Sequence, residues 1–474
     1  VADNCVIDKL GRIGARKGWE AVSSNGAAVL GSSRGIESVF EYVKRDGTKI
    51  VFSAGNNKIF TGTSTLAAVT LPSGYSISAN NWKIVSFNND VYFFQRGHAA
   101  LVSVAGSTTL IAVADGGTAA PAANEVLAAY GRLWAADITA NKYVVYWSDL
   151  LDGDDWHGGS SGSLDLTLVW PTGFDEVVAL SAHNNFLIIF GKKSMIVYSG
   201  ASAPASMTLA DTVEGVGCIA RDSVQHTGTD ILFLSDSGVR SFTRTIQEKS
   251  MPMRDISKNV RTDLTSLVPL QTNAIKSVYS ADEAFYLLTL PDSDTTYCFD
   301  MRSPLQDGSQ RATTWSGLHP LAFTITEAGD IYFGLSSGIV EYTGYLDGTA
   351  NYQMRYFSNP MDFGNASNLK FLKKFNITII GGQNTNSTLN WGYDYSTNFT
   401  KQVFTLTGSV NAGEYGVSEY NTTAEYTASA IINTPKVNTS GNGEVVTIGI
   451  ETEINDTSFS IQKIDIHAIL GRLI

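Results

Sequence analysis

The sequence predicts an all-β protein, an irregular β-propeller of six or seven blades joined to an antiparallel β platform or sandwich. Short apolar segments recur along most of the chain, separated by turns of Gly or Asn. Charged residues make up 16% of the chain, below the ~25% usual in soluble domains, and Gly, Ser, Thr, Asn and Tyr take their place. This composition favours many short strands and turns over long helices.

The recurring unit is an apolar strand, a tight turn, a second apolar strand, a polar turn and a third strand. Dipeptides such as Asn-Asn and Tyr-Gly at the first turn are typical of β-hairpins. One such meander cannot bury both of its faces, whereas radial stacking of several buries them and shortens the exposed edges. A pair of β-sandwiches is the alternative fold. The units are 49–61, 83–95, 126–147, 177–199, 223–244, 277–299 and 321–343.

The pattern predicts three segments: 1–40 as the first part of the platform, 41–350 as the propeller, and 351–474 as the β-domain that completes the platform. After about residue 352 the chain becomes rich in Thr and Asn, with alternating strands such as "KKFNITIIGG" and "FSIQKIDIHAIL". One helix is predicted in "RDISKNVRTDLTSL", residues 254–267. The pattern leaves open whether the 49–61 unit belongs to the platform and whether the last blade borrows a strand.

Composition and charge exclude several classes of function. The chain carries 33 Lys and Arg against 45 Asp and Glu, a formal charge of −12, which argues against a nucleic-acid reader. An acidic wall would nonetheless suit a conduit through which a polyanion has to slide. No run of ~18 apolar residues is present, so no stable membrane insertion is expected. Cys5, Cys218 and Cys298 are too scattered for a disulfide framework or a zinc site.

No catalytic or metal-ligating pattern is found. The six histidines are unpaired at helical or strand spacing, and neither G-x-S-x-G nor a phosphate-binding P-loop occurs. Residues 148–157, "SDLLDGDDWH", suggest either calcium ligands at Asp152, Asp154 and Asp155 or a sialidase-type Asp-box turn. The calcium loop lacks its Gly and distal Glu, so we interpret the segment as a turn whose Trp156 packs against a neighbouring blade. We expect no catalytic residues, no metal and no cofactor.

Several segments resemble the tail nozzle proteins of short-tailed bacteriophages, also called tail tubular protein B, and more distantly the packaged-DNA stabilisation proteins. The resemblance covers most of the chain, although each segment is a loose pattern of packing and turn residues. The segments are "NCVIDKLGRIGARKGW", "YWSDLLDGDDW", "HNNFLIIFGKKSMIVYSG", "VEGVGCIARDSVQHTGTDILFLSDSGVRSFTR" and "FSIQKIDIHAILGRL".

The resemblance implies a β-propeller with a platform built from both chain ends. It implies a homohexameric ring at the distal end of the tail in the virion, docked on the tail adaptor ring. Viral double-stranded DNA would pass through this ring without sequence-specific binding, and the protein would not be an enzyme. Tail fibres are partners of some members, and this shorter chain would lack the insertions that bind them. The alternative functions are a propeller glycosidase or lyase and a glycan-binding propeller at the host surface.

The basic segment near the start of the chain is the candidate interface. Its "LGR" at residues 10–12 recurs at 470–472, and this repeat predicts that the two chain ends pair in one platform, with glycines permitting turns and close backbone approach. We expect a basic rim that meets acidic groups on the adaptor or on a neighbouring subunit, with Trp19 as a buried anchor. Charge reversal at Arg12 and Arg16 should then block assembly without unfolding the subunit. The rim residues are Lys9, Arg12, Arg16, Lys17 and Arg472.

Overall fold

The computed structural model describes the chain except residues 172, 249–254, 366, 383–384, 408–430 and 474. The chain forms two compact units. The propeller comprises residues 21–312 and 317–341, and the terminal unit comprises residues 1–20, 313–316 and 342–474. The predicted propeller limits, 41 and 350, are therefore both too late in the chain.

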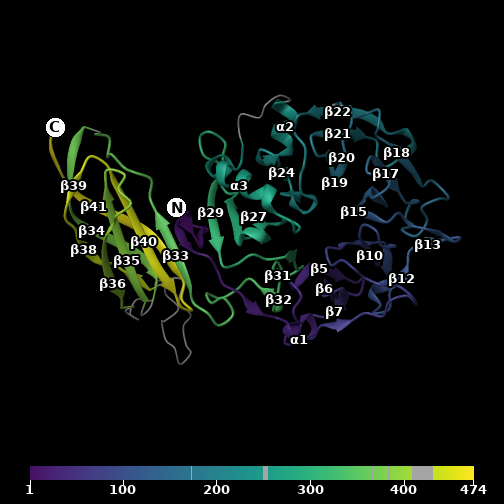
Figure 1. Ribbon diagram of the computed structural model, residues 1–474, viewed down its shortest axis with the longest axis horizontal. Helices are drawn as coiled ribbons and strands as arrows, with labels where there is room; N and C mark the ends of the chain where they lie inside the picture. The colour runs from purple at the N-terminus through teal and green to yellow at the C-terminus, as the bar shows by residue number, and fades with distance from the viewer. Residues whose placement is uncertain (172, 249–254, 366, 383–384, 408–430, 474) are drawn as a thin grey trace. The chain divides into compact units, whose positions relative to one another are not determined.

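The propeller is a closed ring of small antiparallel sheets, and Figure 1 shows their labels following one another around it. Innermost strands of neighbouring sheets pack on one another around most of the ring, and the last, β30, packs on the first, β5. In the first three sheets the strands are β5 (Ile36–Val43), β6 (Lys49–Gly55), β7 (Lys58–Thr61), β8 (Ala67–Ala68), β9 (Lys83–Phe87), β10 (Asp90–Phe94), β11 (Leu101–Ser103), β12 (Ile111–Ala112), β15 (Ala123–Ala129), β16 (Arg132–Ile138), β17 (Val144–Trp147) and β18 (Gly162–Asp165). The hairpin β13 (Ala114–Asp115) and β14 (Thr118–Ala119) follows β12.

The next sheets contain β19 (Val177–His183), β20 (Phe186–Gly191), β21 (Ser194–Ser199), β22 (Thr208–Glu214), β23 (Gln225–His226), β24 (Ile231–Ser235), β25 (Gly238–Ser241), β26 (Lys276–Ser280), β27 (Phe285–Leu290), β28 (Thr295–Asp300), β30 (Ala322–Ile325), β31 (Ile331–Leu335) and β32 (Gly338–Glu341). Among the described residues six blades are separate sheets of three or four strands, and β26–β28 fill one further position of the ring. All seven predicted repeat units, 49–61 included, therefore lie in the propeller.

The core of the propeller lies between neighbouring blades, as the stacking argument predicts. Phe52 of the first blade meets Phe93 of the second, with ring centroids 5.3 Å apart and the rings nearly perpendicular. Phe190 meets Phe233 of the following blade with ring centroids 5.1 Å apart and the rings tilted by 51°. The closing contact of the ring packs Ile36 and Phe60 against Ile339. Each sheet thus buries both faces, which one meander could not do alone.

The hairpin turns between the first two strands follow the sequence prediction. Asn56-Asn57, Asn88-Asn89, Tyr130-Gly131 and Asn184-Asn185 all have positive φ at both residues. This is the backbone of a type I′ turn, which matches the twist of the flanking strands and which Asn and Gly adopt at low cost.

Replacing Asn185 with valine is expected to destabilise the propeller by about 1–2 kcal/mol, because a β-branched residue is strained at the φ of 66° found there. Asn185→Gly is the matched control and should be neutral or slightly stabilising. The measurement is the urea midpoint of each variant. Equal midpoints for the valine and glycine variants would contradict a type I′ turn.

The last blade does borrow a strand from elsewhere in the chain. The strand β4 (Glu20–Ala21) is the outermost strand of the β30–β32 sheet. Directly after it, the amides of Val22 and Ser23 both donate to the carbonyl of Ile339, at 3.0 and 3.1 Å. The propeller therefore starts at residue 21 because its first residues close its last blade.

The described part of the propeller has three short α-helices: α1 (Gly26–Leu30), α2 (Phe242–Glu248) and α3 (Arg261–Leu267). The predicted helix over 254–267 is shorter than expected, since a 3₁₀ turn at Lys258–Val260 precedes α3 and Arg254 lies outside the described residues. Its apolar side, including Ile256 and Leu264, is buried in the propeller core as the spacing indicated. No helix in the described part of the chain combines the length and apolar character that crossing a membrane requires.

The terminal unit is a β-sandwich of two sheets. One runs in the order β1 (Ala2–Asp3), β33 (Tyr352–Phe357), β40 (Val446–Ile454), β35 (Thr385–Tyr393) and β36 (Thr400–Leu406). The other runs in the order β2 (Cys5–Ile7), β3 (Ile13–Ala15), β41 (Phe459–Leu473), β34 (Asn368–Gly381) and β37 (Ile432–Asn433), and β38 (Lys436–Asn438) and β39 (Asn442–Gly443) also pair with β34. The end of β29 (Arg311–Ser316) belongs to this unit, where Thr314 pairs with Asp3.

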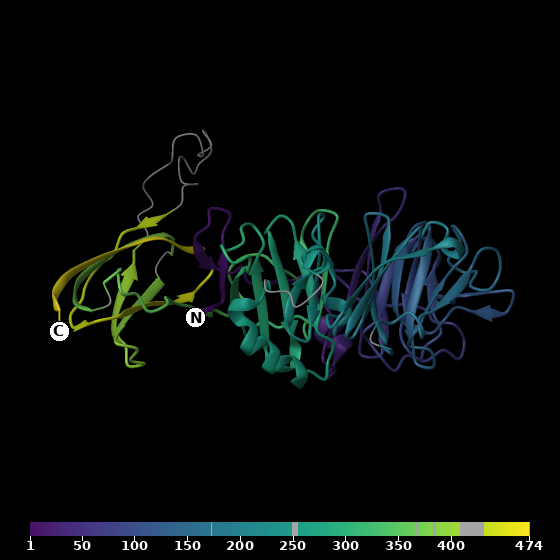
Figure 2. The ribbon, with the colours of Figure 1, turned by 90° about the horizontal axis from the view of Figure 1, so that it is seen from above.

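The sandwich buries one hydrophobic cluster to which both sheets contribute, with Met354, Trp391 and Ile450 from one sheet and Phe375 and Phe459 from the other. Figure 2 shows the long strands β34 and β41 of this unit side by side. The prediction of a platform made from both chain ends is thereby confirmed.

The register of the chain ends differs from the repeat that suggested their pairing. β3 pairs with the beginning of β41, Ile13 with Ile461. Leu470, in the second "LGR", pairs with Lys370 of β34 instead. The predicted close backbone approach is found at Gly18, where a Cβ would lie 1.8 Å from the carbonyl oxygen of Leu346.

Candidate functional site

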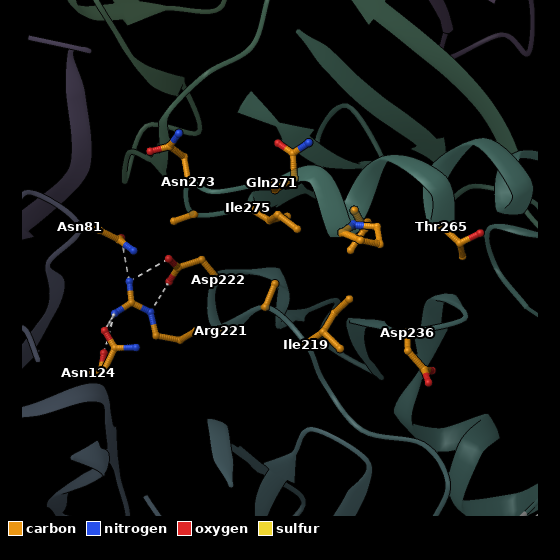
Figure 3. A pocket seen from close by; sticks show the side chains of 14 residues that line it. Asn81, Asn124, Ile219, Arg221, Asp222, Asp236, Thr265, Gln271, Asn273 and Ile275 are labelled. Carbon is orange, nitrogen blue, oxygen red and sulfur yellow. Dashed lines mark hydrogen bonds and ion pairs between the residues drawn. The ribbon is translucent and has the colours of Figure 1, made fainter. Parts of the chain in front are cut away.

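A pocket of the propeller opens beside a group of buried charges near the ring axis. It has a volume of about 570 Å³ and is shown in Figure 3. Its polar wall carries the amides of Asn81, Asn124, Gln271 and Asn273, and its apolar wall is formed by residues such as Ile275. A pocket of this size suits a small molecule whose polar groups are oriented by a few fixed side chains.

Arg221 is the centre of the polar wall. It lies in a 3₁₀ turn (Arg221–Ser223) just before β23 and is only 7% exposed. Its Nε and Nη2 donate to the two carboxylate oxygens of Asp222, at 2.9 and 2.8 Å. Its remaining donors reach Asn81 Oδ1 at 2.8 Å and the backbone carbonyl of Asn124, as Figure 3 shows. This two-point pairing fixes the planar guanidinium in one orientation.

Two lysines and a second carboxylate extend the cluster toward the other side of Asp222. Lys276 Nζ, at the start of β26, donates to Asp222 Oδ2 at 2.8 Å. Lys83 Nζ, at the start of β9, lies 3.5 Å from Glu125 Oε2 and 3.9 Å from Asp222 Oδ1. Glu125, in β15, is 1% exposed and accepts a hydrogen bond from the amide of Leu180 in β19. We call Lys83, Glu125, Arg221, Asp222 and Lys276 the axial charge cluster.

The axial charge cluster was missed by sequence reasoning, although a signal was present. Lys83, Glu125, Asp222 and Lys276 each lie at, or within a residue of, the start of a repeat unit that was recognised by its apolar strands. A charged residue recurring at this place in several units indicates side chains that converge where the first strands of the blades begin. The structure brings them together from four different blades.

Burial and the neighbouring charges shift the pKa values of several members of the axial charge cluster. Burial alone would raise the pKa of Asp222, but Arg221, Lys276 and Lys83 outweigh it and hold the pKa well below its usual range. Burial raises the pKa of Glu125, against the opposing effect of Lys83 and Arg221. Burial lowers the pKa of Lys276, although Asp222 acts in the opposite direction. Asp222 is therefore the ionised carboxylate that holds the three cations together.

The groups that line this pocket favour binding of a ligand, and the carboxylate beside Arg221 is a poor proton donor. Two carboxylates line the pocket, those of Asp222 and Asp236. Asp222 contacts Arg221, and its pKa lies too far below the usual range for it to act as a general acid near neutral pH. A glycosidase needs two carboxyl groups with separated pKa values on either side of the bond it cleaves. Glu125, the cluster member with a raised pKa, is not among the residues that line the pocket.

The predicted basic rim is wrong at Arg16. Its side chain is fully buried, and both Nη atoms bind the carboxylate of Asp347, at 2.8 and 2.7 Å. Nε donates to Asn4 Oδ1 at 2.9 Å, and the guanidinium lies over the Tyr352 ring, 4.1 Å from its centroid. Arg16 directly follows β3, whose Ile13 and Ala15 pack on the sandwich core. Its own side chain is enclosed by Asn4, Asp347 and Tyr352, which keep it away from any surface.

The other rim residues lie at different degrees of exposure. Lys9 is exposed in the turn between β2 and β3, and Arg12 is partly buried and paired with Asp8 at 2.6 Å. Lys17 is half-buried with its ammonium near the Tyr342 ring. The interface role of these residues stays a prediction.

Trp19, the predicted anchor, is only half-buried, and its ring packs against Gly348. The backbone of Arg472 lies in β41, and its side chain lies outside the described residues.

The 148–157 segment forms a turn, as the sequence indicated. Asp152 Oδ1 accepts hydrogen bonds from the amides of Asp154 and Asp155, and Trp156 packs on Phe94 of the neighbouring blade. Asp115, Asp155 and His157 bring three ligand atoms within 4.8 Å of one another. Two of these side chains are exposed, and the Asp155 carboxylate already accepts hydrogen bonds from the amides of residues 157 and 158. Asp152 and Asp154, which the calcium interpretation set aside above would have required, are not part of this group.

Comparison with known proteins identifies no family. No protein-family model matches the chain, and no curated protein matches it. Solved structures that are similar include the computationally designed Ika8 protein (13% identity, TM-score 0.40, 68% of this chain and 99% of that one). They also include BamB from Moraxella catarrhalis (9%, 0.40, 65% and 84%) and the WD40 β-propeller domain of Doa1 (10%, 0.39, 69% and 96%).

Proposed function

We propose that this chain is a structural subunit of the distal nozzle ring of a short-tailed phage, which retains the genome and conducts DNA during ejection. The observation that carries the proposal is the pairing of the two chain ends. The segments of the resemblance at residues 4–19 and 459–473 supply β2, β3 and β41, which are neighbours in one sheet of the terminal unit. This is the platform that the resemblance implies for docking on the adaptor ring.

The axis of the propeller cannot itself be the DNA channel. The axial charge cluster occupies it, and the described cavities beside the cluster measure about 570 and 190 Å³. Such volumes hold small molecules and not a nucleic-acid duplex. In the proposed function the conduit therefore lies between copies of the chain, in a closed ring made by head-to-tail contacts between six subunits. An acidic lumen, which the charge of −12 per chain favours, would let DNA slide without gripping it.

A glycan-binding propeller at the host surface is the second candidate function. The observation in its favour is the larger pocket, where four side-chain amides face an apolar wall as in sites for neutral polar ligands. The low pKa of Asp222 argues against this residue as the proton donor that a glycosidase or lyase would need, which leaves Asp236 as the other carboxylate of the pocket. We propose that the chain has no catalytic activity and needs no cofactor.

Purified full-length chain is expected to form rings of six subunits, counted by negative-stain imaging and mass photometry over a range of concentrations. Lys9→Glu should lower the fraction in rings, because Lys9 is the exposed charge of the β2–β3 turn on the platform. Lys58→Glu, an exposed charge of the first blade, is the matched control and should assemble normally.

The tail adaptor protein, added to the same assay, should promote ring formation if the platform is the docking surface. A chain that stays monomeric with the adaptor present, and that binds or cleaves glycans, would overturn the nozzle in favour of the second candidate. Normal assembly of Lys9→Glu would contradict the role of the rim alone.

A further inference from the structure

The propeller contains a second axial cavity beside the axial charge cluster, which Lys83 and Lys276 line and Arg221 does not. It measures about 190 Å³. Segments of five blades line it, including Ser38 of β5, Gln225 of β23 and Thr324 of β30. Lys83, Lys276 and Asp222 form its charged wall. Two lysines thus line one small cavity, in a chain whose overall charge is strongly negative.

The charges around this cavity do not balance. The axial charge cluster holds three cations, at Lys83, Arg221 and Lys276, against the two carboxylates of Glu125 and Asp222. The two carboxylate oxygens of Asp222 accept hydrogen bonds from Arg221 and Lys276 at 2.8–2.9 Å. Lys83 Nζ is left with carboxylate oxygens at 3.5 and 3.9 Å, which are longer than ordinary hydrogen bonds.

The ammonium group of Lys83 therefore lacks a carboxylate oxygen at ordinary hydrogen-bond distance. Its side chain is 29% exposed, so it is reachable from the cavity, whereas Lys276 is only 9% exposed. A partly buried cation without a short charge-assisted hydrogen bond is less stable than one that has such a partner. One further negative charge near Lys83 and Lys276 would neutralise the excess positive charge of the axial charge cluster.

We propose that the smaller axial cavity is a binding site for a small oxyanion, held between the Nζ atoms of Lys83 and Lys276. The ligand chemistry is that of a carboxylate or phosphate group, whose oxygens accept several short hydrogen bonds at once. The volume admits a group of a few non-hydrogen atoms with water, and excludes a nucleotide or polymer. The site lies within the propeller of one chain, so a test of this site does not depend on whether the chain forms the proposed ring.

Inorganic phosphate is the probe for the first experiment. The full-length chain is titrated with phosphate at constant ionic strength, with chloride as the replaced ion, and the melting temperature and the calorimetric heat are recorded. A saturable rise in melting temperature beyond that of chloride is expected, since a ligand that binds the native state stabilises it. Acetate should compete with phosphate if the site recognises the oxyanion group in general.

Two substitutions locate the binding. Lys83→Met should weaken phosphate binding about tenfold or more, because it removes a charge-assisted hydrogen bond. Lys58→Met, on the exposed edge of the first blade, is the matched control. Thr324→Glu places a carboxylate in the cavity and should abolish the response to phosphate while raising the melting temperature without it.

The phosphate titrations of the native chain and its variants distinguish the proposed site from its absence. Loss of the phosphate response in Lys83→Met and Thr324→Glu, with Lys58→Met unchanged, supports the site. Absence of a saturable response in the native chain, or an undiminished response in both cavity variants, overturns it. If Lys83→Met fails to fold, the Thr324→Glu variant still decides, because Lys83 and the cluster remain intact in it.

Discussion

Replacing Arg16 with methionine is expected to lower the stability of the terminal unit by about 3–5 kcal/mol, the usual cost of breaking a buried ion pair by removing one partner. Asp347 would keep its charge beside the core with no cation to neutralise it, and Asn4 would lose the donor bound to its Oδ1. Methionine preserves most of the volume over the Tyr352 ring, so the loss reports the charge and its hydrogen bonds.

Hydrogen exchange at the amides of β3 and β33 measures this effect in the terminal unit alone. The matched control is Arg12→Met, which removes a partly exposed i,i+4 pair with Asp8 and should cost about 0–1 kcal/mol. A double variant, Arg16→Met with Asp347→Leu, should recover part of the loss, since a well-packed apolar pair often replaces a buried ion pair. Equal effects of Arg16→Met and Arg12→Met would contradict the structural role of Arg16.

Replacing Asp222 with asparagine is expected to destabilise the propeller by about 3–5 kcal/mol at neutral pH. The change keeps the shape of the side chain but leaves Lys83, Arg221 and Lys276 with Glu125 as the remaining anion of the cluster. The measurement is the urea midpoint together with hydrogen exchange at β9 and β26. Asp282→Asn, at an exposed position of the same unit, is the control and should change little.

The difference between native chain and Asp222→Asn should depend on pH in a defined sense. The folded pKa of Asp222 is depressed, so its stabilisation is fully present above the unfolded value of about 3.9 and is lost as the pH falls below that value toward the folded pKa. The two chains should therefore converge in stability below about pH 4. Glu125 titrates in the opposite sense because burial raises its pKa, and it is present in both chains. A difference that is constant down to pH 2 would contradict the low pKa.

Much of the fold could be predicted because its signals are local. Asn-Asn pairs between alternating apolar strands mark type I′ turns at 56–57, 88–89 and 184–185, and the structure has positive φ at each. The pairing of the chain ends was also predicted, although the reason given, the repeated "LGR", does not match the register. Strand pairing between distant segments depends on which face is buried, which a three-residue motif cannot specify.

The candidate sites were harder to predict because burial of a charge is a tertiary property. Arg16 lies among Lys9, Arg12 and Lys17 in a segment that looks like one basic patch. What distinguishes it is Asp347, 331 residues away, which forms the other half of its ion pair. The axial charge cluster likewise joins residues from position 83 to position 276. Only the closure of the ring brings these partners together.

The propeller lies in the sequence between residues 20 and 342, which both belong to the terminal unit. This arrangement sets the order in which the two units can fold during synthesis. On the ribosome, β1, β2 and β3 emerge first but have to wait for β33, β34, β40 and β41 before their sheets exist. At about 5–20 residues per second this delay amounts to tens of seconds. During that time the propeller can close once Ile339 has emerged to meet residues 22 and 23. The platform therefore matures last, so a chain that ends after residue 341 would present a finished propeller without the terminal sandwich.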